Sequence, residues 1–141
     1  MGLFDFGQQK VTDQFLGYMK ITVDKDSNKF ILHRTERFTS SDKLNIYFET
    51  KDKVVVERQK EIYHLIKNNF GKVRTIAFDF LIHSKKYLKS SMTADYKAES
   101  ITIFDQSDHR WELDLLNLRD GFSHIIIEFY KLEPVDFDLR A

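Results

Sequence analysis

Cysteine is absent from this chain of 141 residues. Its absence excludes disulfides, thiolate zinc sites and a cysteine nucleophile, and it is compatible with a reducing cytosol. The first residues, MGLFDFGQQK, are too few and too acidic for a signal peptide. No apolar run approaches the roughly 20 residues of a membrane-spanning helix. We therefore expect a cytoplasmic protein without a membrane partner.

Proline and glycine are scarce. The chain holds 1 Pro and 5 Gly, which leaves no flexible linker and no low-complexity segment. Its length suits one domain. We therefore expect a single domain over residues 1–141, with loosely ordered tails at 1–10 and 135–141.

An excess of one charge is also missing, because 22 basic residues balance 22 acidic ones. Proteins that bind nucleic acid usually carry a basic excess that displaces counterions from phosphate. Here no basic run is longer than Lys85-Lys86. We expect no nucleic-acid partner.

Apolar residues that alternate with polar ones predict six strands. In the first half of the chain, alternation runs through Phe15 to Val23, through Phe30 and Leu32, and through Leu44, Ile46 and Phe48. In the second half, the expected strands are 99–104, 110–116 and 122–130.

A helical period separates these two groups, from about Glu57 to Leu88. The stretch Asn68-Asn69-Phe70-Gly71 interrupts it, and Gly71 stands where a left-handed helix cap is needed. Such a short join predicts an antiparallel helical hairpin. Val54–Val56 is compatible with the start of the first helix or with an extended strand.

Together these elements predict an α+β fold, with antiparallel strands in the order βββ-αα-βββ and a central helical hairpin. A hairpin makes no βαβ crossover, so a parallel nucleotide-binding sheet is disfavoured. The sequence also lacks the GxGxxG and GxxxxGK phosphate-binding motifs.

The stretch DKDSNK resembles the start of a calcium-binding loop, because Asp24, Asp26 and Asn28 alternate. An EF-hand loop also needs Gly at its sixth position, Glu at its twelfth and a helix on each side. Those positions hold Lys29 and Thr35, and the flanks are predicted strands. The stretch is better explained as a hairpin tip, since Asp, Asn and Ser favour turns.

Apolar faces must coincide within a hairpin, and this rule predicts two registers. A four-residue loop, 24–27, pairs Ile21 with Phe30 and Met19 with Leu32. A three-residue loop, 119–121, puts Gly121 at the position that needs a positive φ. That second loop pairs Leu115 with Ile125 and Leu113 with Ile127, and it predicts one core face made of Trp111, Leu113, Leu115, Ile125, Ile127 and Phe129, joined by Ile101 and Ile103.

The same register predicts an acidic strip on the opposite face. Glu112 lies across from Glu128, Asp114 follows two residues along, and His124 lies across from Leu116. Like charges directly across a sheet do not help folding. The strip is therefore either a docking surface for a basic partner, a weak cation site, or a solvated face without a role.

Catalytic signatures are missing. No HxH or HExxH pattern provides zinc ligands, and no GxSxG elbow provides a serine nucleophile. We expect no enzyme activity, no catalytic residue, no metal site and no cofactor. The alternative is a small hydrolase or metal-dependent enzyme that uses His124 with Glu112, Asp114 and Glu128.

Three stretches are similar to a diffuse group of small cytoplasmic bacterial domains of unknown function. They are LGYMKITV; LNIYFETKDK with VVVERQKEIYHLIKNNF; and ESITIFDQSDHRWELDLL with FSHIIIEFY. The resemblance covers roughly residues 14–130 and contains no catalytic motif. Some domains of this group occur in toxin–immunity neighbourhoods, which implies a binding role.

The expected function is a non-enzymatic module that binds another protein, with an immunity-type protein as one option. The expected partner-binding residues are Glu112, Asp114, His124 and Glu128. Free sheet edges also make a homodimer plausible.

Overall fold

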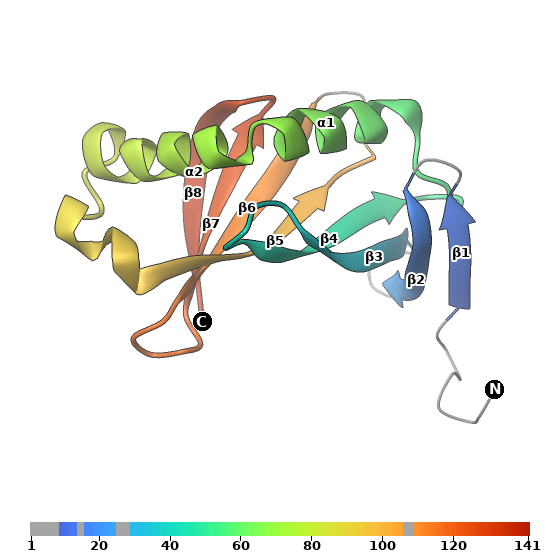
Figure 1. Cartoon of the computed structure of the whole chain (residues 1–141), viewed down its shortest axis with the longest axis horizontal. Helices are drawn as coiled ribbons and strands as arrows, with labels where there is room; N and C mark the ends of the chain where they lie inside the picture. Colours follow the sequence, from blue (N-terminus) through green and yellow to red (C-terminus); the bar gives the residue numbers. More distant parts are fainter. Residues whose placement is uncertain (1–8, 14–15, 25–28, 106–108) are drawn as a thin grey trace.

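The computed structural model describes residues 9–13, 16–24, 29–105 and 109–141. These residues contain eight strands that form one sheet in chain order, with helices across one face (Figure 1). The strands are β1 Gln9–Asp13, β2 Gly17–Asp24, β3 Lys29–Arg37, β4 Lys43–Thr50, β5 Tyr96–Ile103, β6 Arg110–Asn117, β7 His124–Tyr130 and β8 Glu133–Arg140. The helices are α1 Glu57–Asn68, α2 Phe70–Asp79, a π-helical turn η2 Phe80–Ser84 and a 3-10 helix η3 Ser90–Asp95.

The predicted order βββ-αα-βββ is wrong. Four strands precede the helices and four follow them. The sheet is mixed rather than antiparallel, because β4 pairs with β5 in parallel, with Ile46 opposite Ile101. Neighbouring strands on either side of this pair are antiparallel.

The two additional strands overlap the expected tails. β1 includes the last two residues of the segment 1–10, whose first eight residues lie outside the described part. β8 covers most of 135–141, and Phe137 lies opposite Ile127 of β7. Pro134 argues against a central strand but not against an edge strand, where its missing N–H is tolerated. β8 is such an edge.

The predicted helical hairpin is also wrong, because α2 continues roughly in the direction of α1 (Figure 1). Asn69 alone separates them, with φ −131° and ψ 21°. The Val73 N–H donates to the Asn69 carbonyl at 2.8 Å, so hydrogen bonding of the helical type resumes immediately. Gly71 lies inside α2 and does not adopt the left-handed conformation.

This continuous helical path explains the parallel strand pair. Residues 57–84 cover about 40 Å at 1.5 Å per residue, longer than an eight-residue strand of about 27 Å. The chain therefore crosses the sheet and returns through residues 85–95 before β5 begins. Val54–Val56, which the sequence left open, is neither strand nor helix, and Val55 is buried beside the start of α1.

The core lies between the helices and the inner sheet face, and the predicted core face is confirmed. Trp111, Leu113, Leu115, Ile125, Ile127, Phe129, Ile101 and Ile103 are all buried. The rings of Trp111 and Phe129 stack with centroids 4.4 Å apart. The Trp111 indole N–H donates to the Lys131 carbonyl at 2.6 Å, so its burial leaves no unsatisfied donor.

A polar side chain fixes α1 over the parallel pair. Gln59 is only 1% exposed, and its amide donates to the carbonyl of Glu49 at 2.8 Å and to that of Ile103 at 3.1 Å. Its side-chain oxygen accepts the Val56 N–H at 3.0 Å. One side chain thereby joins the helix start to the ends of β4 and β5.

The two predicted registers had different outcomes. The β6–β7 register is confirmed, with Leu113 opposite Ile127, and Gly121 has a φ of 77°. In the first hairpin Ile21 pairs with Leu32, so the predicted register is wrong by two residues. A shift of two preserves which side chains share a face, and patterning alone does not distinguish the two registers.

The tip of that first hairpin, 25–28, lies outside the described residues. Among the residues that are described, no helix is long and apolar enough to cross a membrane.

Candidate functional site

The predicted acidic strip lies on the outer sheet face, away from the helices. Side chains alternate across a strand, so burial of Leu113 and Ile127 places their neighbours outside. Glu112 pairs with Glu128, and His124 pairs with Leu116, both as predicted.

β8 widens this strip. It brings Asp136 opposite Glu128 and Asp138 opposite Ile126. We call the resulting set the acidic face, defined by Glu112, Asp114, Glu128, Asp136 and Asp138. Sequence reasoning missed its last two members, although Asp136 and Asp138 alternate with apolar residues in EPVDFDLR.

Glu112 is the carboxylate of the acidic face whose negative charge is least compensated by neighbouring groups. It is half-buried, and within the described residues its carboxylate accepts no hydrogen bond and joins no ion pair. Burial raises the pKa of Glu112 above its ordinary value, although the positive charges of Arg140 and Arg110 act in the opposite direction. The charged form of this side chain is thus disfavoured by the fold.

Asp114 and His124 form the closest polar contact on this face. The Nδ1 atom of His124 lies 2.6 Å from Oδ1 of Asp114. Burial raises the pKa of Asp114, and the hydrogen bond with His124 lowers it in part. When Nδ1 donates to Asp114, the ring is held in one orientation and Nε2 remains for another partner.

Two arginines offset part of the negative charge. Arg110 forms an ion pair with Glu128, and Arg140 Nε lies 3.5 Å from Asp138 Oδ2. The acidic face still carries five carboxylates against these two guanidinium groups. It therefore presents an excess of negative charge, including Glu128 with a carboxylate on both neighbouring strands.

A hollow lies at the strand ends beside His124. Its volume is about 280 Å³. We call it the strand-end pocket, and its polar wall is formed by Tyr87, Tyr96, Asn117, Ser123, His124 and Arg140. Ile125 and Leu139 supply apolar wall, and Ala141 lies at one side.

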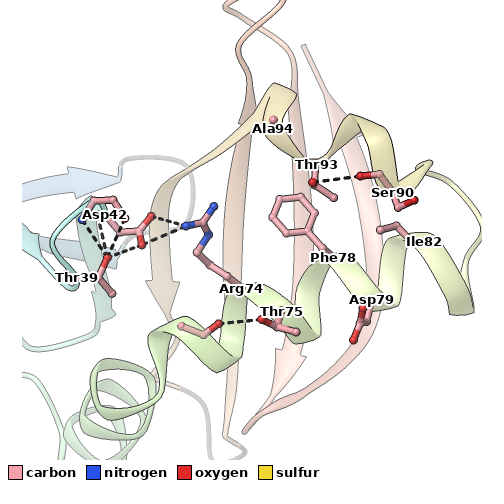
Figure 2. A pocket seen from close by; sticks show the side chains of 12 residues that line it. Thr39, Asp42, Arg74, Thr75, Phe78, Asp79, Ile82, Ser90, Thr93 and Ala94 are labelled. Carbon is pink, nitrogen blue, oxygen red and sulfur yellow. Dashed lines mark hydrogen bonds and ion pairs between the residues drawn. The ribbon is translucent and has the colours of Figure 1, made fainter.

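A larger groove of about 620 Å³ lies between α2, η3 and the loop before β4 (Figure 2). Arg74 points toward Asp42, with Nη1 3.4 Å from Oδ1, and the Thr39 hydroxyl donates to Asp42 at 2.6 Å. Asp42 is buried, so the guanidinium mainly compensates this carboxylate. The ring of Phe78 forms an apolar wall near Thr93. The groove joins three distant segments, and no local motif in the sequence marks it.

The structure contains features for and against the enzyme alternative. A hollow does lie beside His124. However, the neighbouring Ser123 hydroxyl donates to Asp120 rather than to the His124 ring. Among the described residues, no group of three or more His, Cys, Asp or Glu side chains is arranged to hold a metal ion. Hydrolysis at His124 stays a prediction.

Comparison with known proteins adds no relative. No family model matches the chain, and neither a curated protein nor a solved structure matches it.

Proposed function

We propose that this protein is a non-enzymatic binding module that docks a basic protein partner on its acidic face. The partner-binding residues are Glu112, Asp114, Glu128 and the adjacent His124, extended by Asp136 and Asp138 of β8. The proposal keeps the immunity-type role as its most specific form, in which docking on the partner blocks the partner's activity.

The observation that carries the proposal is the row Glu112, Glu128 and Asp136 on three neighbouring strands. Like charges directly opposite each other destabilise a sheet. Folding alone does not favour three carboxylates in one row, with one of them half-buried. A positively charged partner would compensate this arrangement, because complementary charge accelerates encounter and selects the partner.

The ordinary alternative is a solvated face whose charges serve only solubility. Exposed ion pairs contribute little to stability. What favours docking over that alternative is Glu112, which is half-buried and, within the described residues, has no hydrogen bond or ion pair that compensates its charge.

A charge-reversal experiment tests this proposal. The parent chain and Glu112→Lys/Glu128→Lys are immobilised, and proteins retained from an extract of the source organism are identified by mass spectrometry. The matched control is Glu61→Lys/Asp79→Lys, which changes net charge equally at exposed positions of α1 and α2. We expect the parent and the control to retain a basic protein that the acidic-face variant loses.

Retention by both double variants would refute the acidic face as the docking surface. If a protein is lost only from the acidic-face variant, it must also bind the parent directly after purification, and that binding must weaken as salt increases. A captured protein that binds the acidic-face variant as tightly as the parent would also contradict the proposal.

Association of two copies stays a separate prediction. β1 and β8 are the edges of the described sheet. On β8, Val135 and Leu139 are each about half exposed, at 49% and 50%. Sedimentation of the purified chain at increasing concentration tests this prediction.

A further inference from the structure

The strand-end pocket differs from the acidic face in the chemistry it presents. Its polar side chains Tyr87, Tyr96, Asn117, His124 and Arg140 can all donate hydrogen bonds, whereas the Ser123 hydroxyl already donates to Asp120. Among the described residues, no Asp or Glu side chain lines it. A wall rich in donors that includes a guanidinium suits a ligand that supplies acceptors, such as a carboxylate.

The two strongest donors, His124 and Arg140, each lie beside a carboxylate of the acidic face. Asp114 holds Nδ1 of His124 at 2.6 Å, which leaves Nε2 for a ligand. The Nε atom of Arg140 lies 3.5 Å from Asp138 Oδ2, and no hydrogen bond of its terminal nitrogens is found among the described residues. The two terminal nitrogens of the guanidinium therefore remain, in the arrangement that binds a carboxylate through two parallel hydrogen bonds.

A phenol forms a further donor in the pocket wall. Tyr96 is 9% exposed. Burial raises the pKa of Tyr96, and the neighbouring Tyr87 and Asp120 act in the same direction. Its hydroxyl therefore keeps its proton at neutral pH and can donate it to an acceptor.

The remaining wall is apolar and partly aromatic. The Tyr87 ring packs on Phe137, with centroids 5.1 Å apart. Leu139 is 50% exposed and Ile125 forms part of the wall. A ligand here would bury a flat apolar body as well as a charged group.

We propose that the strand-end pocket binds a small aromatic carboxylate. Its carboxylate would lie against Arg140 and His124, and its ring would pack against Tyr87 and Leu139. The volume of about 280 Å³ is at the lower limit of ligand sites, so the ligand is a small molecule with one ring. His124 belongs both to this pocket and to the proposed docking surface, but a small-molecule ligand goes beyond the docking function.

Titration of the full chain by amide NMR tests the proposal, with sodium benzoate as the probe. Benzamide has the same ring without the charge, and acetate has the charge without the ring. We expect benzoate to saturate a single site at millimolar concentration or below, with shifts centred on residues 96, 117, 124 and 139–141. Benzamide and acetate should each bind at least tenfold more weakly.

Single substitutions test which side chains bind the carboxylate of benzoate. Arg140→Gln should weaken benzoate binding at least tenfold, and Tyr96→Phe about threefold or more. The control is Arg119→Gln, since Arg119 is on the same end of the molecule, is 73% exposed in its side chain and does not line the pocket. Its effect should be smaller than twofold.

Three results would overturn the proposal. They are equal affinity for benzoate and benzamide, equal affinity for benzoate and acetate, or equal affinities of Arg140→Gln and Arg119→Gln. The titration needs no protein partner, so its outcome is independent of the docking function proposed above.

Discussion

The inner and outer faces of β6 and β7 belong to the same two strands, yet their residues obey different constraints. On the inner face Leu113 and Ile127 are fully buried and opposite each other. One position away on the outer face, Glu112 and Glu128 are opposite each other with like charge. The first pair stabilises the fold and the second pair does not.

This difference separates residues that the fold requires from residues that it only tolerates. A buried leucine contributes roughly 2 kcal/mol by leaving water, whereas an exposed ion pair contributes about 0–1 kcal/mol. Substitutions on the two faces should therefore differ first in stability and only then in binding. The predictions below test that separation.

The largest effect is expected on the inner face. Leu113→Ala should lower the free energy of unfolding by about 3 kcal/mol, because it leaves a cavity in a packed core. Leu116→Ala, on the half-buried outer face of the same strand, should cost less than about 1 kcal/mol. Urea denaturation of both variants measures the difference. Equal losses would mean that the outer face is also part of a core.

A smaller loss is expected for the buried polar residue Gln59. Gln59→Leu keeps the side-chain volume but leaves the carbonyls of Glu49 and Ile103 without their donor. Each buried acceptor without a partner costs about 1–3 kcal/mol, so we expect a loss of roughly 2 kcal/mol. Denaturant midpoints at equal slope are the readout. An unchanged midpoint would show that these hydrogen bonds do not hold α1 on the sheet.

The smallest expected effect is an increase in the free energy of unfolding, in contrast to the two losses above. Burial raises the pKa of Glu112, so the folded state retains this proton to higher pH than the unfolded state does. The resulting stability is present below the unfolded pKa of about 4.3, and it is lost as pH rises through the folded pKa. Glu112→Gln should therefore raise the free energy of unfolding at pH 7, by less than about 1 kcal/mol.

Thermal unfolding at pH 7 and at pH 4 checks this sign. The advantage of the glutamine variant should shrink toward pH 4. If Glu112→Gln destabilises the protein at pH 7, the Glu112 carboxylate is compensated within the fold and does not need a partner.

The sequence predicted the β6–β7 hairpin because two independent constraints agreed there. Gly121 selects the loop, and the apolar pattern selects the same pairing of Leu113 with Ile127. His124 also proved to contact Asp114, which lies diagonally across the strands and within reach of a long side chain.

The wrong predictions arose where one local sequence pattern is compatible with two different structures. Asn68-Asn69-Phe70-Gly71 suits a helix end, but burial of Phe70 against Phe38, with ring centroids 5.3 Å apart, favours a bend in a continuing path. The parallel β4–β5 pair follows from that path and has no local signal. The strand-end pocket also joins residues from distant segments, such as Tyr87 and Arg140, which no local pattern brings together.

The dissociation constant of the captured partner tests the central claim most directly. It should be measured by calorimetry against the parent, Glu112→Lys/Glu128→Lys and Glu61→Lys/Asp79→Lys at 0.15 M salt. Docking on the acidic face predicts at least hundredfold weaker binding for the first double variant, about 2.7 kcal/mol or more, and less than threefold for the second. Equal dissociation constants for the two double variants would contradict the claim that the acidic face is the binding surface.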